Sequence, residues 1–159
     1  MRSRDLPALV EALREPTRRF VRESRVRIVI LINGAGQVLA QHGFTRSYEV
    51  MNVASLAAAA HSASRALAGV TGAGRWEHLY HAGRERQLFL APLMTPVEEL
   101  ILVAIFDGES SLGIVQLFYH QLACEISALP AMRAAPLGTD QANFERDLES
   151  GLEFLAPEP

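Results

Sequence analysis

The chain is poor in the residues on which several classes of enzyme depend. It contains no lysine, so all 15 of its strongly basic residues are arginine. A Walker-type phosphate loop, which needs a lysine beside the phosphates, is therefore excluded. The glycine-rich segments 34–36 and 72–74 are interpreted as turns, because neither opens a helix whose N-terminus could receive a phosphate. No serine stands in a Gly-x-Ser-x-Gly elbow, and we expect a protein that is not an enzyme.

Metal-binding patterns are also lacking. His78 and His81 are three residues apart on an expected strand, which points them to opposite faces. His61 and His120 fall on different expected helices, with no carboxylate at ligand spacing beside them. Structural or surface roles are the better interpretation, so no metal and no cofactor are expected.

The cellular compartment is inferred from the scarcity of cysteine and of long apolar runs. Cys124 is the one cysteine, so an internal disulfide is excluded and a reducing compartment is indicated. Within an apolar helix this thiol is expected to be an unreactive small hydrophobe. No run approaches the roughly 18 apolar residues that span a bilayer. The net charge of −3 gives no reason to expect nucleic acid or an anionic membrane as partner. A cytoplasmic protein without membrane insertion is expected.

Charge is unevenly distributed along the chain. Residues 1–27 carry 8 arginines against 4 acids, and residues 140–159 carry 6 acids against 1 arginine. Two interpretations stay open: two solvated surfaces of opposite charge, or an acidic tail that contacts a basic first helix.

Hydrophobic periodicity and turn residues predict an α/β (α+β) fold with a five-stranded, mainly antiparallel sheet. One domain over 4–128 is expected, followed by a linker and acidic tail over 129–159 with a short helix over 140–155. Strand 99–106 is the most continuously apolar and is expected to be central. Pro16 predicts a break or kink in the first helix. The expected elements are a helix over 6–21, strands over 27–33 and 37–42, a helix over about 50–70, strands over 76–81, 85–90 or slightly beyond, and 99–106, and a helix over about 111–127.

The helix over 50–70 is unusual because both of its sides are nearly uncharged. One side, expected to face the sheet, has Val53, Leu56, Ala60, Ala63, Leu67 and Val70. The other side has Ser55, Ala58, Ala59, Ser62, Ala66 and Gly69. Small side chains allow a second helix to approach closely, and a second copy of the same helix is an economical partner. The alternative is an alanine-rich helix that lies in water and is stable by propensity alone.

The strand over 76–81 supports pairing with another chain. A strand that directly follows a helix can lie at a sheet edge. Trp76, His78 and Tyr80 are expected on one face and Leu79 on the other, with Glu77 as the only charge. An edge with so little charge is either covered or paired with another strand.

Three segments resemble one family when they are taken in order. IFDGESSLGIV (105–115), VASLAAAAHSASRALAGVTG (53–72) and LYHAGRER (79–86) closely resemble the Roadblock (dynein light chain) superfamily, and nearest its bacterial MglB-like members. The resemblance covers about residues 4–127 and implies a single Roadblock-like domain. It further implies a homodimer with a continuous ten-stranded sheet and paired second helices, on which a small Ras-like GTPase docks.

The resemblance also implies site residues. By position, Ala59, Ser62 and Ala66 fall on or near the GTPase-docking face. Ser62 and Ala66 differ from the residue types expected in close MglB-like relatives, which favours a different GTPase. MglB-like members accelerate hydrolysis by rearranging the GTPase's own catalytic groups, without inserting an arginine. Residues assigned to the dimer interface are Ala58, Arg65, Gly69, Trp76, His78 and Tyr80.

Three functions are therefore considered. The first is a dimeric GTPase regulator, which resembles a GTPase-activating partner. The second is a non-activating Roadblock scaffold that links proteins in a motility or polarity complex. The third is a small-molecule sensor, which requires a cavity.

Overall fold

The computed structural model describes residues 6–43 and 46–133. The expected order of helices and strands is confirmed. The helix expected over 140–155 and most of the linker and acidic tail expected over 129–159 lie outside the described residues. The elements are α1 (Leu6–Ser24), β1 (Ile28–Asn33), β2 (Val38–His42), α2 (Ser47–Thr71), β3 (Leu79–Ala82), β4 (Gln87–Met94), β5 (Glu99–Phe106), α3 (Leu112–Ala128) and the 3-10 helix η1 (Pro130–Met132).

The five strands form one sheet in the order β2-β1-β5-β4-β3, and every neighbouring pair is antiparallel. β5 is central, as its continuous apolar sequence predicts, because both of its faces are buried against helices. β3 is an edge strand, which is also as expected. Among the described elements, no strand pairs with the outer side of β3.

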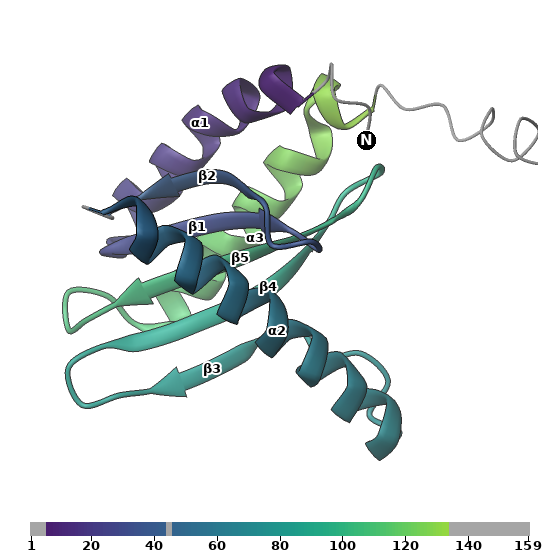
Figure 1. Ribbon diagram of the computed structural model, residues 1–159. Coiled ribbons are helices and arrows are strands. Elements are labelled where there is room, and N and C mark those ends of the chain that lie inside the picture. Colours follow the sequence, from purple (N-terminus) through teal and green to yellow (C-terminus); the bar gives the residue numbers. More distant parts are fainter. Residues whose placement is uncertain (1–5, 44–45, 134–159) are drawn as a thin grey trace, which may run out of the picture.

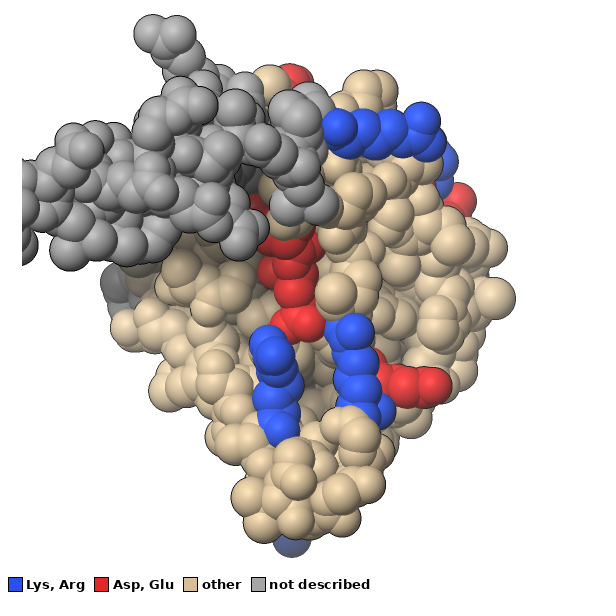
Figure 2. All heavy atoms as spheres, turned by 90° about the vertical axis from the view of Figure 1, so that its right-hand side faces the viewer, with Lys and Arg blue, Asp and Glu red and all other residues tan. Residues whose placement is uncertain are grey.

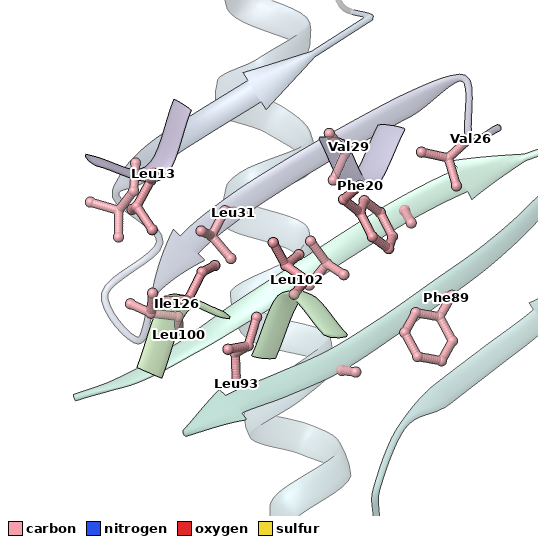
Figure 3. Close-up of a cluster of buried hydrophobic side chains, with 14 of the residues drawn as sticks. Leu13, Phe20, Val26, Val29, Leu31, Phe89, Leu93, Leu100, Leu102 and Ile126 are labelled. Carbon is pink, nitrogen blue, oxygen red and sulfur yellow. The ribbon is translucent and has the colours of Figure 1, made fainter. Parts of the chain in front are cut away.

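Helices cover both faces of the sheet (Figure 1). α1 and α3 pack on one face, where Leu13, Phe20 and Ile126 meet inward-pointing side chains of the sheet such as Leu31 and Leu102 (Figure 3). α2 packs alone on the other face, against a smaller cluster that includes Ile30, Ile32, Leu90, Ile101 and Val103. The result is a three-layer α/β/α arrangement in which α2 has no helical neighbour among the described residues.

Several boundaries differ from the sequence-based expectation. α1 continues through the buried Pro16 to Ser24, so the expected break is absent. β3 begins at Leu79, so Trp76 and His78 lie in the segment before the strand and not on it. α3 begins at Leu112 with Ser111 as its N-cap, and the Ser111 side chain accepts a hydrogen bond from the Ile114 amide.

β4 was expected to end at Leu90 or slightly beyond; it continues to Met94 and includes Pro92. Proline lacks an amide hydrogen and is tolerated in a strand only where no neighbour needs it. The pairing of β3 with β4 ends at Leu90, and beyond that residue β4 pairs only with β5. Pro92 therefore lies in a locally one-sided part of the sheet, which explains its presence in a strand.

Candidate partner-binding surface

The orientation of α2 is the main correction to the sequence-based interpretation. Of the six residues expected to face the sheet, Leu56, Leu67 and Val70 are 70%, 54% and 87% exposed. Ala63 is exposed as well, and only Val53 and Ala60 are partly buried. The residues that face the sheet are instead Val50, Ala54, Ala57, His61 and Ala68.

The sequence-based orientation of α2 was wrong for a steric reason. On this face of the sheet, Ile30, Ile32 and Ile101 already supply large side chains. A helix that presents alanines can approach such a surface closely, whereas a helix that presents leucines would be held away. Because nearly every position of α2 is apolar or small, the hydrophobic pattern does not identify a unique inward side.

The rotation leaves a row of large apolar side chains uncovered, which we name the leucine stripe: Leu56, Ala63, Leu67 and Val70. With 3.6 residues per turn these positions fall within a sector of about 60°. Contiguous exposed apolar side chains on one helix mark an interaction surface. Beside the stripe lies the small-residue face, which consists of Ser55, Ala59, Ser62, Ala66 and Gly69, all exposed.

The direction of the leucine stripe follows from Ala58. A methyl group placed on Gly36, in the turn between β1 and β2, would meet Ala58 Cβ at 3.5 Å, so Ala58 faces that turn. Leu56 and Leu67 lie on the opposite side of the helix, roughly 160–180° away. In Figure 1 the β1–β2 turn and the edge strand β3 lie on opposite sides of α2, so the stripe is directed to the β3 side. An apolar helix side and an unpaired strand thus lie on the same side of the molecule.

The predicted site residues therefore separate into groups. The three residues assigned to GTPase docking are all exposed to solvent on the small-residue face: Ala59, Ser62 and Ala66. Ala58, assigned to the dimer interface, is half-buried and packs against the sheet of its own protomer. Gly69 is exposed on α2.

The other predicted dimer residues lie near β3 or below α2. Tyr80 is half-buried, packs against the core on the α1 and α3 side and donates a hydrogen bond to Gln87 Oε1 at 2.6 Å. His78 stacks at 5.2 Å on Phe89. Arg65, Gly69, Trp76 and His78 line one cleft of about 410 Å³ between α2, the segment after it and the ends of β4 and β5.

One residue in this cleft was missed by sequence reasoning. Glu99, the first residue of β5, binds His61 Nε2 through Oε1 at 2.6 Å and Arg75 through Oε2 at 3.0 Å. Arg65 lies 3.5 Å from Oε1. His61 was expected to lack a neighbouring carboxylate, and a partner 38 residues away leaves no local signal in the sequence.

Metal-binding groups and membrane-spanning helices are not found among the described residues. No group of three or more histidine, cysteine, aspartate or glutamate side chains within residues 6–43 and 46–133 is arranged to hold a metal ion. None of the helices in these ranges is long and apolar enough to cross a membrane. The cleft is bordered by Leu90 of the apolar cluster under α2 and otherwise lies between the end of α2, the segment after it and the ends of β4 and β5.

Comparisons with known proteins agree with this architecture. The structure is similar to MglB of Myxococcus xanthus, with a TM-score of 0.71 and 22% identity over 81% of this chain and 95% of that one. It is similar to the gliding protein MglB of Thermus thermophilus, with a TM-score of 0.63 and 25% identity over 85% and 96% of the two chains. An MglB with a tetrameric arrangement gives a TM-score of 0.61 and 26% identity over 80% and 90%.

The sequence comparisons assign the family. No curated protein matches the sequence. The family model described as the Roadblock/LC7 domain matches residues 14–106, which include every strand, α2 and most of α1. That match spans more than half of the chain, and with the five-stranded sheet and the exposed second helix it shows that this protein belongs to the Roadblock/LC7 domain family.

Proposed function

We propose that this protein is a homodimeric regulator that binds a small Ras-like GTPase and modulates its GTP hydrolysis or nucleotide state. It acts by contact and contributes no catalytic residue of its own. The observation that carries the proposal is the outward side of α2, where the leucine stripe and the small-residue face are both exposed. The similarity to two MglB structures at 25% and 26% identity supports a regulator of this type.

The two exposed surfaces are assigned to two partners. The leucine stripe faces the open β3 edge, so a second copy related by two-fold symmetry would cover the stripe and extend the sheet at once. Large apolar side chains that are permanently covered suit such a stable interface. Ala58 already packs within its own protomer, and the dimer assignment therefore moves from Ala58 to Leu56, Leu67 and Val70.

The small-residue face is assigned to the GTPase. Ala59, Ser62 and Ala66 carry no large apolar group, so they can be exposed to water between binding events without promoting aggregation. They also permit close backbone approach of a partner. A surface that binds and releases a partner needs side chains that tolerate water and also allow close contact.

The proposal is tested with the cognate GTPase loaded with GDP or with a non-hydrolysable GTP analogue. We expect a complex in isothermal titration calorimetry that depends on the bound nucleotide, and altered GTP hydrolysis in single-turnover assays. Binding without any change in hydrolysis would identify the non-activating scaffold. Absence of binding in both nucleotide states would reject the proposal.

The surface assignment is tested with Ala66→Arg. A buried arginine without a partner charge is expected to weaken GTPase binding by at least about tenfold. Its matched control is Ala8→Arg on α1, also an exposed helical alanine but on the opposite face of the sheet. Both variants should keep the wild-type melting temperature, because surface substitutions change stability little. Equal weakening by both variants would place the GTPase elsewhere.

A further inference from the structure

The second half of α2 is held differently from the first half. Residues of the first half pack directly on the sheet through Val50, Ala54 and Ala57. From Ser62 to Thr71 only Ala68 is buried. In this half the helix extends beyond the sheet (Figure 1), with the 410 Å³ cleft below it. Apolar packing therefore provides few contacts to fix the orientation of this half.

Charged side chains meet where the packing is sparse. Figure 2 shows basic and acidic side chains around a hollow on this side of the molecule, and the lining of the cleft includes Arg65, Arg75 and Glu99. Glu99 is attached to the sheet, since it pairs with Met94 at the β4–β5 end. His61 and Arg65 come from α2, and Arg75 comes from the segment that links α2 to β3. One carboxylate thus connects three separate parts of the fold.

We propose that Glu99 is the positioning residue that fixes the second half of α2 and the segment 72–78 relative to the sheet. Each exposed arginine alone would form a weak surface pair, but the two share one carboxylate and act together. The His61–Glu99 contact is different, because the two side chains are only 10% and 21% exposed and their atoms are 2.6 Å apart. Loss of the negative charge would leave His61 with only a weaker, neutral acceptor and both arginines without their shared partner.

The position of this half matters for binding. It carries Ser62 and Ala66 of the small-residue face and Leu67 and Val70 of the leucine stripe. Glu99 touches neither surface, yet it sets where both are presented. This consequence for partner affinity rests on the proposed function, whereas the positioning itself does not.

The test uses Glu99→Gln, which keeps the shape of the side chain and removes its charge. Its matched control is Glu77→Gln, an exposed glutamate of the same linking segment with no ion pair among the described residues. Backbone amide hydrogen exchange, followed by mass spectrometry, is measured for peptides from 62–71 and from β1. We expect about tenfold faster exchange in 62–71 for Glu99→Gln only, with β1 unchanged, because local opening is separate from global unfolding.

A second readout separates electrostatic positioning from loss of packing. In the wild-type protein, exchange in 62–71 should accelerate as ionic strength rises, because two of the three contacts are exposed and screened by salt. Glu99→Gln should lose much of this salt dependence. Equal exchange in wild type and variant, or unaltered salt dependence, would overturn the proposal.

Should Glu99→Gln fail to fold, Arg75→Gln tests the same inference. Arg75 has a largely exposed side chain, so its replacement leaves the core intact. We expect faster exchange in 72–78 with a smaller effect in 62–71; no change in either segment would overturn the proposal. If the GTPase does not bind wild-type protein, the proposed function fails while the exchange result still decides the role of Glu99.

Discussion

At the scale of single residues, Gly43 shows where the backbone requires glycine. It follows β2 with a φ of +89°, and a Cβ at this position would lie 2.1 Å from the carbonyl oxygen of Arg27. Gly34, in the turn between β1 and β2, has no atom within 4 Å of an added Cβ. Gly34 directly follows β1 and Gly43 directly follows β2, but the two glycines differ in the space and the backbone conformation around them.

We therefore expect Gly43→Ala to lower the free energy of unfolding by about 1–3 kcal/mol. Gly34→Ala should change it by less than about 0.5 kcal/mol. Urea denaturation of both variants checks this prediction. If Gly43→Ala destabilises the protein as little as Gly34→Ala does, the contact with Arg27 is relieved by a backbone shift and the prediction is wrong.

Asp107 provides a second residue-scale prediction, which concerns acid. The pKa of its carboxyl group is lowered from 3.8 by the hydrogen bond from the Glu109 amide and by the bond from Arg27 Nε at 2.7 Å. The folded state thus favours the ionised form. The contribution of Asp107 is fully present above about pH 3.8 and disappears as the pH falls through the lower folded-state pKa.

Asp107→Asn is therefore expected to be less stable than wild type near pH 7, and the difference should shrink below pH 3.8. Urea midpoints measured from pH 2 to pH 7 test this. Glu109→Gln is the control, because the contact of Glu109 with Asp107 uses its backbone and not its side chain. A wild-type-to-variant difference that is constant across this pH range would contradict the assignment.

At the scale of elements, the strongest prediction concerns α2 and its part in self-association. Leu67 of the leucine stripe is 54% exposed and Leu117 of α3 is 56% exposed, so they form a matched pair on opposite faces of the sheet. We expect Leu67→Glu to weaken self-association by at least about tenfold, since a carboxylate would be buried at the proposed interface. Leu117→Glu should leave self-association unchanged.

Analytical ultracentrifugation over a range of concentrations distinguishes these outcomes. Both substitutions replace an exposed leucine by glutamate on a helix, so their effects on solubility and net charge are matched. Dissociation by Leu117→Glu alone would move the interface to α3. Wild-type protein that is monomeric at high concentration would reject the homodimer itself.

The same elements show what sequence alone predicts. Strand β5 was predicted over the residues that form it, because seven consecutive apolar residues after Glu99 indicate a strand buried on both faces. Its central place followed from the same feature. The order of elements and the resemblance carried by 105–115 led to the family, which the family model confirms.

Prediction from sequence failed where distant residues decide the outcome. The inward side of α2 depends on the size of side chains in β1 and β5, which are remote in the chain. The start of β3 depends on where β4 can pair with it, which left Trp76 and His78 outside the strand. The contact between His61 and Glu99 could not be predicted, because neither residue shows a local pattern that requires the other.

At the scale of the whole molecule, the two faces of the sheet have different roles in the proposed function. α1 and α3 cover one face and contact each other, with Arg19 and Glu125 forming an ion pair at 3.1 Å. α2 covers the other face and presents the surfaces assigned to partners. Binding on the α2 side should therefore leave the opposite side accessible.

Cys124 is a natural chemical probe of the face of the sheet that α1 and α3 cover. It was expected to be an unreactive small hydrophobe within an apolar helix, and its side chain is exposed on α3. Its thiol should react with a maleimide or disulfide reagent at the same rate, within about twofold, in the free protein, the homodimer and the GTPase complex. The homodimer should also persist in reducing agent, since the α2-side interface contains no cysteine.

The matching reporter for the binding side is Ala66→Cys combined with Cys124→Ser. When nine-tenths of the protein is bound, modification of this cysteine should slow by about tenfold, because only the free fraction reacts. Protection at position 66 together with full reactivity at Cys124 would assign binding to the α2 face alone. Protection of Cys124 would mean that the partner reaches around the sheet edge to α3, and the two-sided division of the molecule would be wrong.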